Sequence, residues 1–191
     1  VDWMGSGVRL GKGDLFITEA CEYVRSFMTL HPSYIVINNI DDDHLDYFKD
    51  IDDITQTFID FMHLLPEDGI LFANPDDVYT KKVIDACDKK VITYSINSNG
   101  DYNAENVSYD EMGNPSYDVV LNGKNLGRIK LNVPGMHNVQ NSLAAIAVAH
   151  TVCGLSIQDC AESLTHYHLA GRRFQLMGEK EGVKIFHDYA H

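Results

Sequence analysis

Apolar and polar positions alternate along the first part of the chain with two periods, one typical of strands and one typical of helices. Residues 15–18 and 34–37 are short β-branched or aromatic runs followed by polar residues, so we expect two buried strands. Over residues 51–65 the apolar positions recur at helical spacing, and Pro66 with Gly69 closes the segment. The pattern therefore predicts an amphipathic helix that follows two strands.

The next segment repeats this alternation of strand and helix. Residues 69–73 and 91–94 are predicted strands, and residues 78–87 form a predicted helix between them. Asn74 followed by Pro75 predicts the N-cap and the first position of that helix. Strands that alternate with helices of about 12–15 residues indicate right-handed βαβ units and a mostly parallel sheet covered on both faces.

The pattern changes after Ser95. Residues 97–125 are rich in Asn, Gly, Asp and Ser, and alternating stretches at residues 117–121 and 128–133 predict antiparallel strands. Asn122 followed by Gly123 fits a two-residue hairpin turn. We therefore expect a small antiparallel appendage on the sheet.

Two helices and a pair of strands are predicted in the rest of the chain. Residues 138–152 are rich in alanine and apolar on most sides, which predicts a helix buried in the core. Ser156 and Asp159 form a capping-box pattern at the start of another helix. Residues 174–177 and 183–186 are two strand-like runs around a Gly-containing turn.

These patterns together predict an α/β fold in which a mostly parallel sheet, flanked by helices, carries a small antiparallel appendage. The chain has 191 residues, 45% of them hydrophobic, which is enough for a substantial core. We place one domain at residues 1–170. Residues 171–191 are expected to be a hinge and the first strands of a second domain, because about 20 residues are too few to form one.

Charge and composition narrow the range of partners. Fifteen Lys and Arg residues against 28 Asp and Glu residues give a net charge of -13 with no basic cluster, so we expect no nucleic-acid partner. No apolar run approaches the ~20 residues that span a bilayer, and the first residues have no signal-peptide pattern, so we expect a cytoplasmic protein without membrane contact. The four cysteines lie far apart and are expected to be buried, reduced thiols.

The first candidate site combines Glu19 and Glu22 with the loop of residues 38–46, which includes Asn39 and His44. Both segments follow predicted strands, and ligands of open α/β sheets bind at the carboxyl ends of strands. Carboxylates, an imidazole and an amide could together hold Mg²⁺. The alternative is that these polar residues are solvated or cap turns.

Two further candidates concern nucleotide binding. Asn138 and Asn141 lie three residues apart at a helix start, so their amides could share one face and bind a planar base edge, or Asn138 could simply be the N-cap. Arg172 and Arg173 could bind phosphate oxygens or form surface ion pairs. No segment matches G-x-x-x-x-G-K-[ST], so any nucleotide site in this chain is incomplete.

In their order along the chain, these motifs resemble those of the Mur ligase family, the ATP-dependent enzymes that attach amino acids to the peptidoglycan precursor. The motifs that carry the resemblance are Glu-Ala-Cys-Glu-Tyr (19–23) with Arg-Ser-Phe (25–27), Asn-Ile (39–40) with Asp-His-Leu-Asp-Tyr (43–47), Pro-Gly-Met-His-Asn-Val-Gln-Asn (134–141) with Ala-Ala (144–145), Gly-Arg-Arg-Phe (171–174) and Asp-Tyr-Ala-His (188–191).

The resemblance implies a three-domain enzyme with ATP and Mg²⁺ as cofactors. This chain would then cover the central domain after its P-loop and the start of the C-terminal domain. By similarity, Glu19 and His44 would be the Mg²⁺ ligands, with Asn39 beside them. Asn138 and Asn141 would bind the adenine.

The resemblance also implies roles near the end of the chain. Arg173 would contact phosphate, Asp188 the ribose, and Tyr189 and His191 the muramoyl and alanine groups. The substrates would be UDP-N-acetylmuramate and L-alanine, joined through an acyl phosphate. His44 and Arg173 would be the catalytic residues, because phosphoryl transfer depends mainly on charge neutralisation.

One departure bears on the branch of the family. Several Mur ligases carry a carbamylated Lys after the His-containing motif, but this chain has no Lys between Lys49 and Lys81, which fits the alanine-adding branch. Two alternatives stay open: another Mur-type ligase of an acid with an amino acid or peptide, such as the muropeptide-recycling enzyme, or a catalytically silent nucleotide-binding domain.

Overall fold

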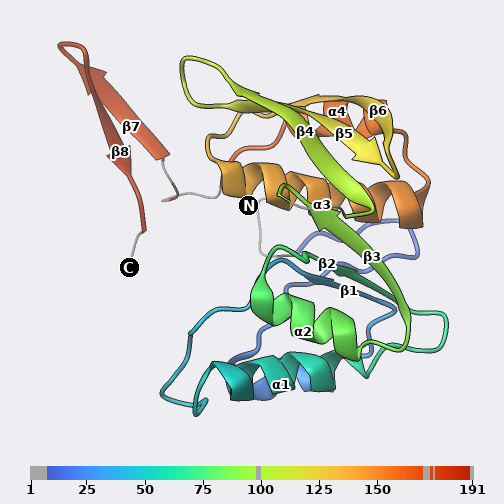
Figure 1. The fold of residues 1–191 in the computed structure, drawn as a ribbon. Coiled ribbons are helices and arrows are strands. Elements are labelled where there is room, and N and C mark those ends of the chain that lie inside the picture. The colour runs from blue at the N-terminus through green and yellow to red at the C-terminus, as the bar shows by residue number, and fades with distance from the viewer. Residues whose placement is uncertain (1–7, 98–99, 170–172, 174, 190–191) are drawn as a thin grey trace. The chain divides into compact units, whose positions relative to one another are not determined.

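The computed structural model describes residues 8–97, 100–169, 173 and 175–189 (Figure 1). The chain divides into two compact units, residues 19–166 and residues 1–18 with 167–191, and each is described by itself. The larger unit contains, in chain order, the 3-10 helix η2 (Tyr23–Thr29), β1 (Tyr34–Ile37), α1 (Ile51–Met62), β2 (Ile70–Ala73), α2 (Val78–Ala86), β3 (Lys90–Ser95), β4 (Tyr102–Tyr109), β5 (Pro115–Leu121), β6 (Lys124–Lys130), α3 (Met136–Cys153) and α4 (Ile157–Thr165). The smaller unit contains β7 (Gln175–Lys180) and β8 (Val183–His187).

Six strands of the larger unit form one sheet in the order β1-β2-β3-β4-β5-β6. The first three pairings are parallel and the last two are antiparallel. Helices α1 and α2 lie on one side of the parallel strands and α3 lies on the other (Figure 1). The predicted α/β fold with a mostly parallel sheet is confirmed, and the antiparallel strands continue the same sheet.

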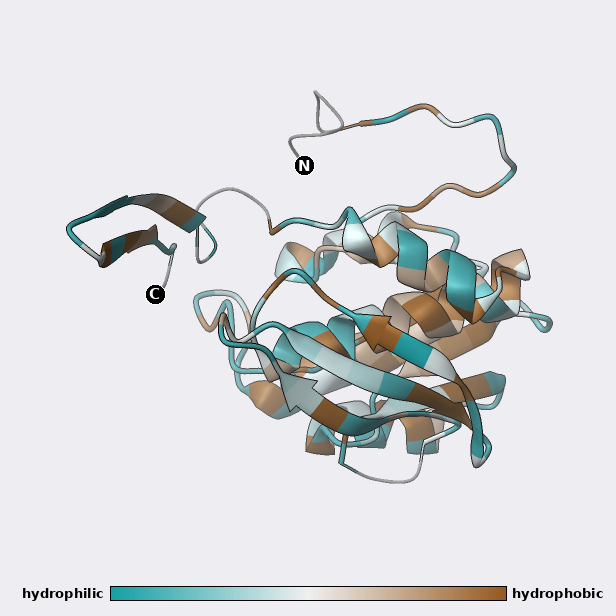
Figure 2. Ribbon diagram, turned by 90° about the horizontal axis from the view of Figure 1, so that it is seen from above, coloured by the Kyte–Doolittle hydropathy of each residue, from teal (hydrophilic) through white to brown (hydrophobic). Residues whose placement is uncertain are grey.

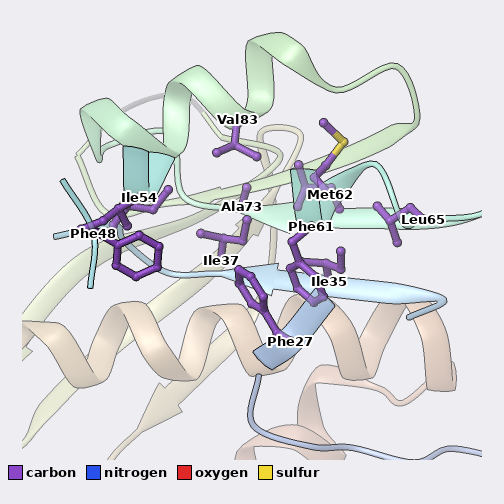
Figure 3. Packing of buried hydrophobic residues seen from close by; sticks show 12 residues of the cluster. Phe27, Ile35, Ile37, Phe48, Ile54, Phe61, Met62, Leu65, Ala73 and Val83 are labelled. Atoms are coloured by element: carbon purple, nitrogen blue, oxygen red, sulfur yellow. The ribbon is translucent and has the colours of Figure 1, made fainter. Parts of the chain in front are cut away.

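Hydrophobic packing between α1, α2 and the sheet forms a buried core on one face of the sheet (Figure 3). Ile35 and Ile37 of β1 are each 3% exposed and face this cluster, because alternate residues of a strand point to the same side. The rings of Phe27 and Phe61 stack with their centroids 4.2 Å apart. This packing anchors the strand whose end carries the candidate site.

Helices α1 and α2 begin at aspartate caps. The Asp50 side chain accepts a hydrogen bond from the Asp53 N–H, and the Asp77 side chain accepts one from the Thr80 N–H. The prediction that Asn74 is the N-cap of α2 is therefore wrong. Asn74 is buried, and its side-chain oxygen instead accepts a hydrogen bond from the N–H of Asp76, two residues on, as Asn commonly does in turns.

The antiparallel half contains one strand that the sequence did not predict, β4. The predicted hairpin is confirmed: β5 pairs with β6 around Asn122 and Gly123, whose φ angles are 49° and 79°. The last strand spans Lys124–Lys130, so the predicted range of 128–133 was placed too late.

Helix α3 is the central helix, in contact with four strands and with α4. It spans Met136–Cys153, with Gly135 at the N-cap and Gly154 at the C-cap. Gly154 has a left-handed backbone, as is common just beyond the C-terminus of a helix. The predicted buried helix is confirmed, as is the capping box of Ser156 and Asp159 at α4. Figure 2 shows hydrophobic and hydrophilic residues in alternating bands along helices and strands, as amphipathic elements require.

The smaller unit contains an antiparallel hairpin in which Gln175 lies opposite His187. It confirms the two predicted strands, apart from Phe174, which lies outside the described residues. The strand predicted at residues 15–18 is wrong: Phe16 and Ile17 are 85% and 89% exposed, and the segment has no strand pairing. Strand-like residues form a strand only where a neighbouring strand accepts their backbone hydrogen bonds.

Two further predictions can be compared with the structure. All four cysteines are free, but only Cys160 is buried, whereas Cys21 and Cys153 are exposed, so the predicted burial holds for one of them. Within the described residues, no helix combines the length and the apolar character needed to cross a bilayer.

Candidate functional site

Three side chains of the larger unit form the candidate metal site: Glu22, Asp43 and His44. One ligand atom from each lies within 4.8 Å of the others. His44 Nε2 is 3.5 Å from a Glu22 carboxylate oxygen, and His44 Nδ1 is 3.7 Å from Asp43 Oδ1. Within the part of the chain that the structure describes, this is the single group of three such residues.

The loop after β1 holds His44 in an unusual backbone conformation, with φ at 55°. The carboxylate of Asp43 accepts a hydrogen bond from the His44 N–H at 2.8 Å. The His44 carbonyl accepts hydrogen bonds from the N–H groups of Tyr47 and Phe48 at 2.8 and 2.9 Å. Because Phe48 is 2% exposed in the hydrophobic cluster, the core fixes the end of this loop.

Glu22 is held by the irregular helix η2, which starts at the next residue. Val24 and Arg25 both have left-handed φ values, 48° and 55°. The Arg25 guanidinium lies 3.6 Å from Asp53 and 3.5 Å from Asp60, both on α1. These contacts attach η2 to α1 on the side of the sheet where the hydrophobic cluster lies.

Tyr23 provides an aromatic wall for His44. The two ring centroids are 4.6 Å apart, and Tyr47 packs edge-on against Tyr23. The Tyr23 hydroxyl donates a hydrogen bond to Asp46 at 2.9 Å. That hydrogen bond and the aspartate charge raise the pKa of Tyr23, so the hydroxyl stays protonated at neutral pH.

A small pocket of about 180 Å³ adjoins the metal cluster. Its polar lining comes from Glu22, Asn39, Asp41 and Asp43. Its apolar lining comes from Ile40, Ile54 and Phe58. The structure thus brings Asn39 to the same place as Glu22 and Asp43. Asn39 and Asp43 follow β1, as expected for a site at the carboxyl end of a strand, whereas Glu22 follows residues 15–18, which form no strand.

The start of α3 presents the two asparagines differently. Asn138 is 5% exposed, and its side-chain amide donates a hydrogen bond to the Pro134 carbonyl at 2.7 Å. The N-cap position belongs to Gly135, which has a φ of 100°, so the alternative that Asn138 caps the helix is wrong. Asn141 is exposed, and its side-chain oxygen accepts a hydrogen bond from the Asn38 amide at 3.3 Å.

The structure does not test the roles of the other predicted site residues. Glu19 is exposed, three residues before the glutamate that contacts His44, and its role as a metal ligand stays a prediction. Arg173, Asp188 and Tyr189 belong to the smaller unit, and their roles also stay predictions. His191 lies outside the described residues.

The donor set of the cluster fits a hard divalent cation. Two carboxylates supply oxygen ligands and an imidazole supplies nitrogen, which suits Mg²⁺ or Mn²⁺ better than a soft metal. A cation of this kind could also bind phosphate oxygens, which a chain of net charge -13 would otherwise repel.

The fold and this site occur together in a known family of proteins, and the chain belongs to it: the Mur ligase family. The Mur ligase middle domain matches residues 8–149. This match covers the whole sheet, the candidate metal site and most of α3.

Curated relatives match over the whole chain. The chain is 44% identical over 191 residues to a UDP-N-acetylmuramate–L-alanine ligase of Caldanaerobacter subterraneus subsp. tengcongensis, and 43% identical to one of Alkaliphilus metalliredigens. In both cases 100% of this chain aligns with 41% of the relative. The chain therefore spans less than half the length of these relatives.

Solved structures of Mur ligases have a similar fold. The UDP-N-acetylmuramate-alanine ligase MurC from Thermotoga maritima is 26% identical, with a TM-score of 0.72 over 87% of this chain and 37% of that chain. A UDP-N-acetylmuramate:L-alanyl-gamma-D-glutamyl-meso-diaminopimelate ligase from Neisseria meningitides is 30% identical, with a TM-score of 0.65 over 76% of this chain and 43% of that chain.

Sequence reasoning did not single out the contacts made by Glu22 and Tyr23. Glu22 was part of the candidate cluster, but the metal was assigned to Glu19. The sequence offered no signal that separates Glu22 from Glu19, because both are acidic residues of the same motif. The structure supplies the missing information, namely which glutamate reaches His44.

Proposed function

We propose that this chain is the central, nucleotide-binding part of a cytoplasmic ATP-dependent ligase that joins L-alanine to UDP-N-acetylmuramate in peptidoglycan precursor synthesis. The observation that carries the proposal is the 44% identity over the whole chain to relatives of that name. In this proposal residues 1–170 belong to the central domain and residues 171–191 to a hinge and the start of the C-terminal domain.

The proposed chemistry has three steps. An oxygen of the lactyl carboxylate of UDP-N-acetylmuramate attacks the γ-phosphorus of ATP, the bond to the β–γ bridging oxygen breaks, and the products are an acyl phosphate and ADP. The amine of alanine attacks the acyl carbon to form a tetrahedral intermediate, and phosphate leaves as the amide forms. Two anions must approach each other in the first step, so neutralisation of charge is the main contribution of the protein.

Residues of the cluster have the right chemistry for that contribution. Glu22, Asp43 and His44 would hold Mg²⁺, with Asn39 in the adjoining pocket. When bound, Mg²⁺ would lower the repulsion between the carboxylate and the phosphates. We keep Glu19 as an alternative carboxylate ligand, because it precedes the cluster by three residues in the same motif.

Residues elsewhere would bind the rest of the substrates. Asn138 and Asn141 would bind the adenine, and Arg173 and Asp188 the phosphate and ribose. Tyr189 and His191 would contact the muramoyl and alanine groups. These assignments rest on the motifs of the family and on the position of the α3 start beside the end of β1.

The test measures phosphate release by the full-length enzyme with ATP, Mg²⁺ and UDP-N-acetylmuramate. We expect release to depend on L-alanine. Dependence on the tripeptide L-alanyl-γ-D-glutamyl-meso-diaminopimelate instead would support a recycling ligase, as the name of the Neisseria structure suggests. If neither L-alanine nor the tripeptide gave phosphate release, the result would support a catalytically silent nucleotide-binding domain.

The chain by itself should be inactive as a ligase and should bind Mg-ATP weakly, because no segment of it supplies the P-loop amides and lysine that hold β- and γ-phosphates. Calorimetry of the 191-residue chain with Mg-ATP tests this expectation. Micromolar affinity or alanine-dependent phosphate release by this chain would contradict it.

A further inference from the structure

The buried hydroxyl of Tyr94 joins β3 to the end of β1. Tyr94 is 0% exposed, and its hydroxyl lies 2.6 Å from Asn38 Oδ1 and 2.9 Å from the Ile37 carbonyl oxygen. A hydroxyl has one proton, so these two acceptors share it. Burial raises the pKa of Tyr94 well above its ordinary value, and the hydroxyl therefore remains a donor throughout the physiological range.

Asn38 in turn forms hydrogen bonds with α3 and with the residue that follows β2. Its side-chain amide donates to Asn141 Oδ1 at 3.3 Å. Its backbone carbonyl accepts hydrogen bonds from the side-chain amides of Gln140 at 3.1 Å and of Asn74 at 3.0 Å. One residue thus links the ends of three parallel strands to the first turns of α3.

The position of Asn38 connects this network to both parts of the proposed nucleotide site. The next residue, Asn39, lines the pocket beside the metal cluster, and Asn141 lies on the helix proposed to bind the base. The bond from Tyr94 to the Ile37 carbonyl is buried and the bonds that Asn38 accepts are part-buried, so they are stronger than in water and restrict where Asn38 can lie. The last bond, from Asn38 to Asn141, is exposed. Under the proposed function, this network would set the distance between the residues that bind the base and those that bind the phosphates of one nucleotide.

We propose that Tyr94 and Asn38 are positioning residues that hold the start of α3 in register with the metal loop. This inference rests on the proposed function, because it assigns the network a role in binding Mg-ATP. The two residues act through Asn141 and Asn39 and are not proposed to touch the nucleotide. Loss of the network should therefore weaken nucleotide binding while the fold persists.

The same sheet offers a matched control, Tyr117 on β5. Its hydroxyl is also buried, lies 2.7 Å from Ser142 Oγ on α3, and has a pKa raised by burial. Tyr117 therefore has the same chemistry and the same burial as Tyr94. Its hydroxyl bonds directly to α3, whereas that of Tyr94 bonds to the end of β1 and reaches α3 through Asn38, beside the metal loop.

The experiment compares Tyr94→Phe with Tyr117→Phe in the full-length enzyme. Calorimetry gives the Kd of Mg-ATP, kinetics give the KM for ATP and kcat, and thermal unfolding gives Tm. Loss of one buried hydrogen bond should raise Kd and KM roughly three- to tenfold in Tyr94→Phe. Tyr117→Phe should lower Tm about as much as Tyr94→Phe does, because each loses one buried hydrogen bond. It should leave Kd and KM within about twofold of the unaltered enzyme.

A double variant tests whether the effect passes through Asn141. If it does, Tyr94→Phe should add little to the Kd of Asn141→Ala, because both changes remove the same contribution. Should Tyr94→Phe fail to fold, Asn38→Ala provides the same test at a half-buried position. We expect it to raise Kd as Tyr94→Phe does.

Two outcomes would overturn the inference. One is unchanged Kd and KM in Tyr94→Phe or Asn38→Ala. The other is an equal rise in Tyr94→Phe and Tyr117→Phe, which would mean that any loosening of α3 suffices. Failure of the proposed function looks different: the unaltered enzyme would then not bind Mg-ATP at all, and both proposals would fall together.

Discussion

The hydrophobic cluster between α1 and the sheet and the polar network at the ends of β1, β2 and β3 hold the same strands by different forces. In the cluster, Phe27, Ile35 and Phe61 are each below 5% exposed, and their side chains pack without hydrogen bonds. In the network, Asn38 and Tyr94 are linked by hydrogen bonds of defined geometry.

This difference separates stability from function along a single strand. Apolar burial contributes free energy in proportion to area, whereas a hydrogen bond contributes little net free energy but restricts distance and angle. We therefore expect changes in the cluster to lower stability and leave nucleotide affinity alone. Changes at the strand ends should weaken nucleotide binding, with a smaller loss of stability.

The largest expected effect comes from truncation in the cluster. Phe61→Ala removes a ring that is 4% exposed and stacks on Phe27, so the free energy of unfolding should fall by about 3–5 kcal/mol. Val36→Ala on β1, 46% exposed, should change it by less than about 1 kcal/mol. Urea titration measures both. A raised KM for ATP in the folded Phe61→Ala variant would contradict the expectation that changes in the cluster leave nucleotide affinity unchanged.

The second effect concerns the metal site. His44→Ala in the full-length enzyme should lower kcat about 100-fold, because a metal ligand stabilises charge in the transition state. Tm should hardly change, since the contacts of the side chain are with Glu22, Asp43 and Tyr23, which lie outside the hydrophobic cluster. His63→Ala, an exposed histidine at the end of α1, is the control. Full activity of His44→Ala at saturating Mg²⁺ would rule out the ligand role.

The third effect tests the base-binding assignment of Asn141. Asn141→Ala should raise the KM for ATP roughly tenfold and narrow the preference for ATP over GTP, because an asparagine amide can match the edge of adenine. Its exposure predicts an unchanged Tm. Gln158→Ala, an exposed amide on α4, serves as the control. A variant that loses stability but keeps its base preference would mean that Asn141 only supports the helix.

The smallest effect lies outside both regions, in the capping box of α4. Hydrogen bonds from Ser156 lower the pKa of Asp159 below its ordinary value of 3.8. The folded state therefore favours the charged form, so this contribution to stability is complete well above pH 3.8 and is lost as the pH falls through the lowered pKa. Asp159→Asn should be less stable than the unaltered enzyme at pH 7, and the difference should shrink in acid. A difference that stays constant with pH would contradict this.

Periodicity predicted the elements whose stability comes from apolar faces. The positions of β1, α1, α3 and the β5–β6 hairpin followed from the spacing of apolar residues and from Asn122 and Gly123. Strand β4 was missed because only Tyr102 and Ala104 in it are buried, and backbone pairing with β3 and β5 holds the rest. Residues 15–18 have the composition of a strand but no pairing partner, which composition cannot reveal.

The candidate site was predictable in its residues but not in its contacts. Asn39, His44, Asn138 and Asn141 could be named because they occur in motifs. The contact of Asn38 with Tyr94 joins residues 56 positions apart and depends on the register of β1, β2 and β3. Short-range patterns contain no information about such a register, so the positioning residues emerged only in three dimensions.

The left-handed backbone of His44 lowers folding stability at a position whose side chain is proposed to be needed for activity. A φ of 55° suits glycine and costs free energy for a residue with a side chain, so His44→Gly should relax the loop while deleting the imidazole. A laboratory selection for heat resistance alone would therefore favour loss of this histidine. Its presence in the chain is best understood as a trade-off, in which some folding stability is given up to keep the ring beside Glu22.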